Sequence, residues 1–109
     1  MSISEISIHD LASLHQPVIV DVREIDEYTS GHVPGAINIP LSQVQQRAQE
    51  FDLGDTVYVI CQAGGRSMKA CEFLSQQPSL NATKFVNVLG GTGAWMIEGH
   101  EVISGDSPS

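Results

Sequence analysis

One stretch of the chain, residues 56–67, indicates the fold class: Thr56-Val57-Tyr58-Val59-Ile60-Cys61-Gln62-Ala63-Gly64-Gly65-Arg66-Ser67. Its first five residues form a short apolar, β-branched run, which predicts a buried strand over residues 56–60. The run that follows the stretch, residues 68–74, has a helical pattern. The two glycines between these runs predict a tight turn. A cysteine is therefore expected where a buried strand ends and a helix begins.

That position favours a reactive thiol. A helix N-terminus leaves backbone N–H groups free and carries a partial positive charge. Gly64 and Gly65 permit the positive φ that lets successive N–H groups face one anion, and Arg66 adds a fixed charge. These residues predict that Cys61 is a nucleophile with a lowered pKa, working through a covalent intermediate. The alternative on these residues alone is a buried cysteine at a strand end, followed by an ordinary glycine turn.

Short apolar strands alternate with helices along the chain, which predicts one α/β domain with a mostly parallel sheet. In such sheets ligands bind beyond the carboxyl ends of the strands, where we expect Asp21–Arg23, the Cys61 loop and Leu89–Gly93. The domain is expected to cover residues 1–103, with a disordered tail over 104–109. Expected strands are 4–6, 17–22, 36–40, 56–60 and 84–88; expected helices are 8–15 (capped by Ser7), 24–29, 43–50 (capped by Ser42), 68–77 and 94–98.

The formal charge of −8 at pH 7, with only five Lys or Arg, argues against a nucleic-acid partner. Three of those cations, Arg23, Arg66 and Lys69, lie in or near the segments singled out here. An acidic body with a small cationic spot suits a small anionic substrate, although the charge equally serves to keep a protein soluble. No apolar run is long enough to span a bilayer and no signal-peptide pattern follows Met1, so a cytoplasmic location is expected.

The two cysteines, Cys61 and Cys71, predict neither a disulfide framework nor a zinc site. Cys71 shares a helical face with Ala70 and Leu74, which indicates a core residue. No metal or cofactor is expected.

Four segments together resemble the rhodanese (sulfurtransferase) family. They are Asp21-Val22-Arg23-Glu24 with Glu27-Tyr28, then Gly31-His32-Val33-Pro34-Gly35-Ala36-Ile37-Asn38-Ile39-Pro40, then Cys61 to Ser67, and finally Gly90-Gly91-Thr92-Gly93-Ala94-Trp95. They occur in the order and spacing of that family and cover nearly the whole chain. The resemblance implies a three-layer α/β/α fold with a five-stranded, mostly parallel sheet.

The resemblance also implies a sulfurtransferase. Cys61 would take sulfane sulfur from a donor, become a persulfide and pass the sulfur to cyanide or a thiol. The loop Gln62, Ala63, Gly64, Gly65 and Arg66 would form the substrate cradle, and Ser67 would cap the helix and reach the sulfur. Asp21 and Arg23 would orient the loop from behind, or else form a plain surface ion pair. His32 is interpreted as structural, and Trp95 as core or pocket wall.

Loop length and charge refine this interpretation. Cys61 and Arg66 have four residues between them, as in sulfurtransferases, whereas the phosphatases that resemble this family have one more. Two-domain thiosulfate sulfurtransferases carry basic residues where this chain has Ala63 and Glu27. A larger donor, such as glutathione persulfide or a persulfidated protein, is therefore as plausible as thiosulfate.

Two alternatives stay open. The chain could serve as a sulfur-relay or protein-interaction module that docks to a partner protein thiol rather than turning over freely. It also resembles rhodanese domains attached to membrane segments or other modules, so it could be one domain of a larger protein.

Overall fold

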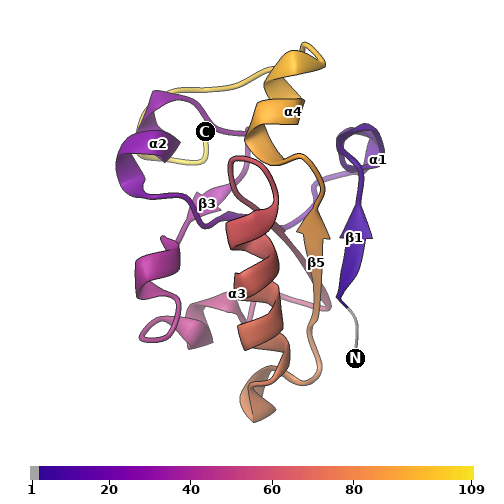
Figure 1. Cartoon of the computed structure of the whole chain (residues 1–109), viewed down its shortest axis with the longest axis vertical. Helices are drawn as coiled ribbons and strands as arrows, with labels where there is room; N and C mark the ends of the chain where they lie inside the picture. The colour runs from indigo at the N-terminus through magenta and orange to yellow at the C-terminus, as the bar shows by residue number, and fades with distance from the viewer. Residues whose placement is uncertain (1–2) are drawn as a thin grey trace.

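A computed structural model describes residues 3–109 of the chain. The strands are β1 (Ser4–Ile6), β2 (Ile19–Asp21), β3 (Ile37–Asn38), β4 (Thr56–Ile60) and β5 (Lys84–Val88), and the α-helices are α1 (Ile8–Ser13), α2 (Ile25–Ser30), α3 (Gly65–Ser75) and α4 (Gly91–Ile97). Three 3-10 helices, η1 (Leu41–Gln43), η2 (Ala48–Phe51) and η3 (Pro78–Leu80), lie in the connections. The elements form the five-stranded α/β architecture expected from the sequence (Figure 1).

The five strands form one sheet in the order β1-β5-β4-β2-β3, and all four strand pairs are parallel. Because the strands are parallel, their carboxyl ends meet at one edge of the sheet. Figure 1 shows α2, α4 and the loop before α3 at the end to which the arrowheads of β1 and β5 point. The candidate segments therefore meet at this edge, as predicted.

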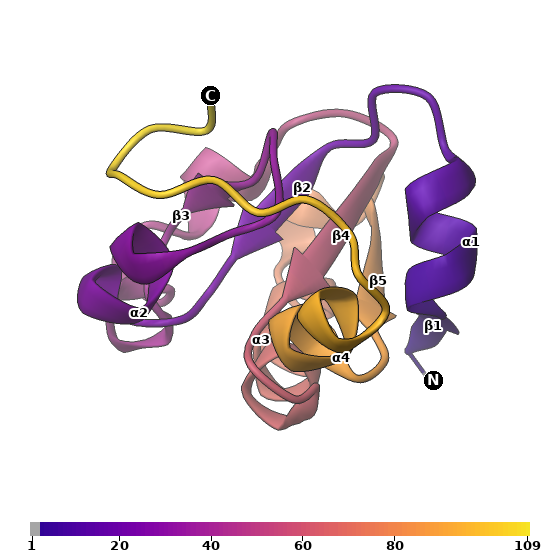
Figure 2. The same ribbon diagram turned by 90° about the horizontal axis from the view of Figure 1, so that it is seen from above.

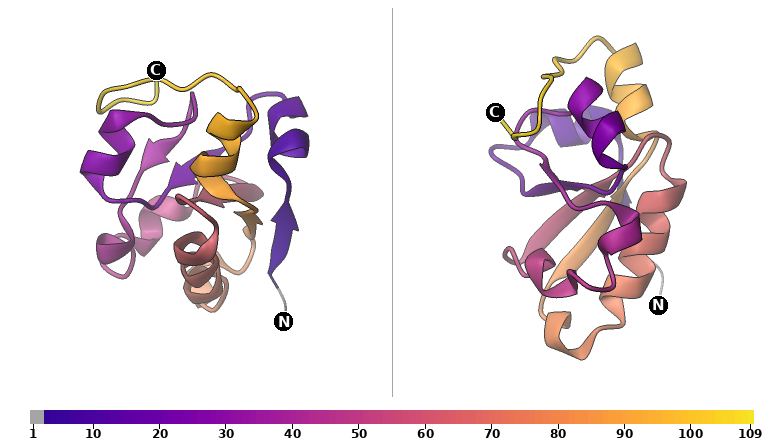
Figure 3. Two further views of the ribbon diagram at one scale, coloured as in Figure 1. Left: turned by 45° about the horizontal axis from the view of Figure 1, so that its top comes forward. Right: turned by 90° about the vertical axis from the view of Figure 1, so that its left-hand side faces the viewer.

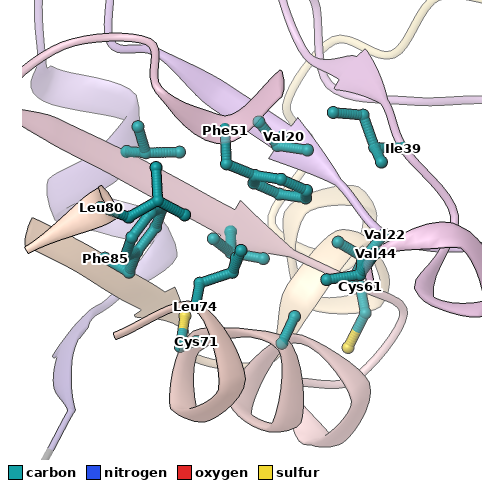
Figure 4. Close-up of a cluster of buried hydrophobic side chains, with 13 residues drawn as sticks. Val20, Val22, Ile39, Val44, Phe51, Cys61, Cys71, Leu74, Leu80 and Phe85 are labelled. Atoms are coloured by element: carbon teal, nitrogen blue, oxygen red, sulfur yellow. The ribbon is translucent and has the colours of Figure 1, made fainter. Parts of the chain in front are cut away.

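Successive side chains along each strand point to opposite faces of the sheet, so the core has two layers. Val57, Val59 and Cys61 face one side of the sheet and pack with Ala70, Cys71 and Leu74 of α3. Ile60 faces the other side, in a second cluster with side chains of α1, α2 and α4. The three-layer α/β/α fold is thereby confirmed, and Figure 4 shows the α3-side cluster with Cys61 and Cys71 in it.

Element boundaries follow the predictions closely at β1, β4 and β5. The predicted cap of α1 is present, since the Asp10 N–H donates to Ser7 Oγ at 3.1 Å. β2 and β3 are shorter than predicted, α1 ends at Ser13, and α4 begins three residues before Ala94.

The helix predicted over residues 43–50 is wrong. The structure has η1 and η2 with a turn between them, and Ser42 lies inside η1 instead of capping a helix. The Ser42 hydroxyl donates to the Glu24 carboxylate at 3.1 Å. Val44 and Phe51 are buried in this segment while most of its side chains are polar and face solvent. Such a thin apolar stripe gives a regular helix little to bury.

The C-terminal segment runs from α4 toward α2 (Figure 2 and Figure 3). Its backbone makes defined contacts: Gly105 N–H donates to Thr29 O at 2.9 Å, and Gly35 N–H donates to Pro108 O at 2.9 Å. Both contacts involve residues of the segment 104–109, for which the sequence predicts a disordered tail. No helix within residues 3–109 has the length and apolar character needed to cross a membrane.

Candidate active site

Cys61 lies directly after β4, at the carboxyl edge of the sheet, with only 1% of its surface exposed. Its Sγ accepts a hydrogen bond from Gly64 N–H at 3.1 Å and lies 3.3 Å from Ser67 Oγ. Gly64 has φ 111° and is the N-cap of α3, so the chain turns back over the sulfur before the helix starts. The predicted strand-loop-helix arrangement is confirmed.

The environment of Cys61 lowers the pKa of its thiol. Burial of the thiol acts in the opposite direction and raises the pKa. Hydrogen bonds from the Ser67 side chain and from the backbone N–H groups of Ser67, Gly64 and Ala63 stabilise the thiolate and outweigh burial. Three of these four donors are backbone N–H groups, the kind of donor that the sequence predicts for this loop.

Cys71 contrasts with Cys61. It is fully buried within the cluster under α3, beside Leu74 in Figure 4, and burial raises the pKa of its thiol to about 12. A thiol held in this way stays protonated and unreactive near neutral pH. The prediction that Cys71 is a core residue is confirmed.

The start of α4 fixes the other side of the loop. Thr92 N–H donates to Cys61 O at 2.8 Å, and Gly93 N–H donates to Gln62 O at 3.0 Å. The approach is close at Gly91, which has φ +60°: a Cβ there would lie 2.3 Å from Cys61 O. The glycines of the Leu89–Gly93 segment therefore let α4 hold the loop through backbone contacts.

Asp21 and Arg23 form a buried ion pair behind the loop. Arg23 Nη2 lies 2.9 Å from Asp21 Oδ2, with 4% and 0% of the two side chains exposed. Arg23 also donates from Nη2 to Gly31 O at 2.8 Å and from Nη1 to Gln62 Oε1 at 3.3 Å. The alternative of a plain surface pair is wrong, and the Gln62 bond gives the pair a direct contact with the loop.

Arg66 forms an ion pair that the sequence did not reveal. Its Nη1 and Nη2 donate to Oε1 and Oε2 of Glu27 at 2.7 Å and 2.9 Å, and both side chains are about one-third exposed. The Arg66 hydrogen bonds lower the pKa of Glu27 to about 2. The Glu27 carboxylate thus offsets the charge of Arg66, the one arginine of the loop. We call the solvent-facing side of the loop, where this pair lies, the mouth of the site.

Ser67 lies in the first turn of α3, and Gly64 is the cap, so the predicted capping role of Ser67 is wrong. The hydroxyl does reach the sulfur, and it also donates to Asn87 Oδ1 of β5. Asn87 was not singled out from the sequence. The available signal was a lone amide within the otherwise apolar strand end Phe85–Val88.

The loop residues Gln62, Ala63 and Gly65 are exposed, so the mouth of the site is open to solvent. His32 is buried, stacks on Tyr28 with ring centroids 3.7 Å apart and lies within hydrogen-bonding distance of Tyr28 O and Ser107 O. Trp95 packs in the second core cluster and donates to Glu101 O. Both residues have the structural surroundings that the sequence indicated. Within residues 3–109, no group of three or more His, Cys, Asp or Glu is placed to hold a metal ion.

Several known proteins that resemble this chain are named sulfurtransferases. The sulfurtransferase of Allochromatium vinosum is 30% identical over 94 residues, covering 86% of this chain and 85% of that protein. Thiosulfate sulfurtransferase 16 of Arabidopsis thaliana is 33% identical, covering 90% and 88%. The structure of a rhodanese-related protein from Thermoplasma volcanium superposes with a TM-score of 0.81 at 34% identity, covering 92% of this chain and 97% of that one.

Some relatives are longer than this chain. The chain spans 40% of the length of "Putative sulfur carrier protein YrkF" and 64% of YqhL, both from Bacillus subtilis, at 42% and 38% identity. The family model described as "Rhodanese-like domain" matches residues 7–98, which include all four segments quoted above. The chain therefore belongs to the rhodanese-like domain family.

Proposed function

We propose that the chain is a sulfurtransferase that carries sulfane sulfur on Cys61 as a persulfide. The observation that carries the proposal is the position of Cys61 Sγ, 3.1 Å from Gly64 N–H, inside a loop whose outer residues are open to solvent. An anion on this sulfur, or on a second sulfur bonded to it, meets backbone donors rather than apolar side chains. Relatives that are named sulfurtransferases support the class of reaction.

The reaction has two displacement steps. The Cys61 thiolate attacks the outer sulfur of the donor, the S–S bond of the donor breaks, and the rest of the donor leaves with the electron pair. This yields Cys61–S–S⁻. A thiol or cyanide then attacks the terminal sulfur, the new S–S bond breaks, and the Cys61 thiolate returns. Atoms and electrons balance without an external oxidant or reductant.

The residues of the chain have separate roles in this scheme. The backbone from Gln62 to Arg66 holds the charge of the terminal sulfur. Asp21 and Arg23 hold Gln62 through the contact of Arg23 Nη1 with Gln62 Oε1. The start of α4 fixes the carbonyl groups of Cys61 and Gln62, which keeps the loop amides turned toward the sulfur.

The charge at the mouth favours donors other than free thiosulfate. Glu27 neutralises Arg66, and no basic side chain follows Cys61 before Arg66. A dianion such as thiosulfate meets little net positive charge there. We propose a low-molecular-weight persulfide or a persulfidated protein as the preferred donor, and a thiol as the acceptor.

A second candidate is a sulfur relay that exchanges sulfur only with a docked partner protein. The neutralised mouth and the relative named as a sulfur carrier favour it. Transfer from glutathione persulfide to a small thiol, measured without any other protein, separates the two. Turnover on small thiols alone excludes an obligatory relay, and its absence together with turnover on adding a partner supports the relay.

The second cysteine, Cys71, provides the control for that assay. Cys61→Ala abolishes transfer if the proposal is right, and Cys71→Ala retains it because Cys71 is a buried core thiol. Transfer that persists in Cys61→Ala overturns the proposal.

A further inference from the structure

Asn87 is a buried amide that the reaction steps above do not use. It lies on β5 with 2% of its surface exposed, two residues after Phe85. Strand alternation places Asn87 on the same face as Phe85, which is the face covered by α3. In the pairing of β1 with β5, Asn87 is the register partner of Glu5.

The contacts of Asn87 fix the orientation of its amide. Its Nδ2 lies 3.2 Å from Glu5 Oε2 and 3.2 Å from Gly64 O. A carboxylate and a carbonyl only accept hydrogen bonds, so the amide nitrogen must be the atom that faces them. The amide oxygen, Oδ1, therefore faces Ser67, and the Ser67 hydroxyl donates to it.

Two acceptors, Asn87 Oδ1 and Cys61 Sγ, lie next to the one hydroxyl proton of Ser67. A hydroxyl carries one proton, and Ser67 Oγ lies next to both Asn87 Oδ1 and Cys61 Sγ. While Ser67 donates to Asn87, Oγ can only accept from sulfur, which suits a protonated Cys61 thiol. The chain from S–H to Oγ–H to Oδ1 is then complete.

Ionisation of Cys61 breaks this chain. If the Ser67 proton stays on Asn87, the thiolate faces an oxygen lone pair at 3.3 Å. If the hydroxyl turns to the thiolate, the buried Oδ1 of Asn87 loses its donor, and an unpaired buried acceptor is costly. Either outcome penalises a charge on Sγ.

We propose that Asn87 is a positioning residue that competes with Cys61 for the Ser67 hydroxyl proton and so favours states in which Sγ is uncharged. The thiol is one such state. The persulfide is the other, because its charge resides on the terminal sulfur while Sγ is bonded on both sides. In the sulfur-transfer cycle, Asn87 thus favours the loaded form over the empty thiolate.

Other groups around Cys61 act on its charge without taking the Ser67 proton. Arg66 attracts the thiolate, and backbone N–H groups of Ala63, Gly64 and Ser67 donate to it. Cys71 lies on α3 and stays protonated, while Arg23 contacts the loop at Gln62. Glu5 lies on the far side of Asn87. None of these competes for the Ser67 proton, so a substitution series separates them from Asn87.

The test is the pH dependence of Cys61 alkylation by iodoacetamide in the full chain. Asn87→Ala frees Ser67 to donate to the thiolate, so the midpoint falls by about one pH unit. Ser67→Ala raises the midpoint, because the Ser67 hydroxyl turns to the thiolate when Cys61 ionises and its loss removes that donor. In the Ser67→Ala background, Asn87→Ala has no further effect, because the contested proton is gone. Asn87→Leu, which also lacks an acceptor but fills more of the space, gives the same fall.

Two results overturn the inference: an unchanged midpoint in Asn87→Ala and Asn87→Leu, or an equal fall in the Ser67→Ala background. Asn81→Ala, at an exposed turn, is the control for loss of an asparagine. If both Asn87 variants unfold, the wild type still decides by NMR. The Asn87 side-chain amide resonances then shift as the pH passes the Cys61 midpoint, and this shift is smaller in Ser67→Ala. Asn87 amide resonances that do not change with the ionisation of Cys61 contradict the inference.

The inference deepens the proposed function but fails separately from it. Alkylation needs no sulfur donor, so it reports on the Ser67 proton even if Cys61 never becomes a persulfide. Conversely, a persulfide on Cys61 with no Asn87 effect removes only the role of Asn87.

Discussion

Glu27 and Arg66 form a two-point ion pair at the mouth of the Cys61 loop, with N–O distances of 2.7 Å and 2.9 Å. The two residues come from α2 and α3, which are 39 positions apart in the chain at this contact. The pair orients the Arg66 guanidinium and offsets part of its charge. The net charge beside Arg66 therefore depends on α2 as well as on α3.

The first prediction concerns donor selectivity. Glu27→Gln leaves Arg66 uncompensated, so kcat/KM for thiosulfate rises about three- to tenfold at low salt, while kcat/KM for a less charged persulfide donor changes little. Asp26→Asn, the neighbouring acidic residue with no Arg66 contact, is the matched control. An equal change in both variants would trace the effect to net charge alone and contradict the role of the pair.

The second prediction concerns acid stability. Arg66 holds the pKa of Glu27 at about 2, below the ordinary value of 4.5 for a glutamate. A lowered folded-state pKa contributes stability above pH 4.5, and this contribution is lost as the pH falls from 4.5 toward 2. Urea unfolding across that range gives a smaller loss of stability in Glu27→Gln than in the wild type. Parallel pH curves for the two proteins would show that the pair adds nothing to stability.

The third prediction concerns Arg66. Arg66→Ala removes a cation that favours the Cys61 thiolate, so the alkylation midpoint rises. Arg47→Ala is the control, since Arg47 forms an exposed pair with Glu50 inside η2 and its preceding turn. Arg66→Ala also leaves the Glu27 carboxylate unpaired. The same rise of the midpoint when Arg66→Ala is added to Glu27→Gln shows that this unpaired carboxylate is not the cause. An unchanged midpoint in Arg66→Ala removes Arg66 from this role.

The fourth prediction concerns the contact between α4 and the loop. In Gly91→Ala the new Cβ would lie 2.3 Å from Cys61 O and 2.6 Å from Gln62 O. Relief of that overlap moves the loop, so we expect a loss of about 2–4 kcal/mol of stability together with loss of Cys61 reactivity. Gly99→Ala also has a positive φ, +82°, but nothing lies within 4 Å of its Cβ. Gly99→Ala therefore costs only the free energy of placing a side chain at a positive φ, about 1 kcal/mol of stability. Equal effects of the two substitutions would contradict a specific clash.

The sequence predicted the parts of this site that are local in the chain. β4 follows from its β-branched run, and the turn at Gly64 follows from the glycine pair. The ordered motifs indicated the parallel sheet and the position of Cys61. The wrong helix over residues 43–50 shows the limit of propensity, because a polar segment with few buried side chains follows the surface it covers.

The parts that the sequence missed depend on tertiary contacts. Nothing near Glu27 indicates Arg66 as its partner, and nothing near Ser67 indicates Asn87. Ser67 was expected to cap α3, but the left-handed Gly64 takes that position and leaves the serine hydroxyl free to bond sideways. These contacts arise only when the sheet edge brings α2, α3 and β5 together.

Intact-protein mass spectrometry shows whether Cys61 carries sulfane sulfur. Reduced protein is incubated with thiosulfate or with glutathione persulfide, freed of donor and measured before and after addition of a thiol. If Cys61 is the sulfur carrier, we expect a gain of one sulfur atom on Cys61, its absence in Cys61→Ala, its presence in Cys71→Ala, and its loss to the thiol. No gain of sulfur from either donor, or a gain that persists in Cys61→Ala, would contradict it.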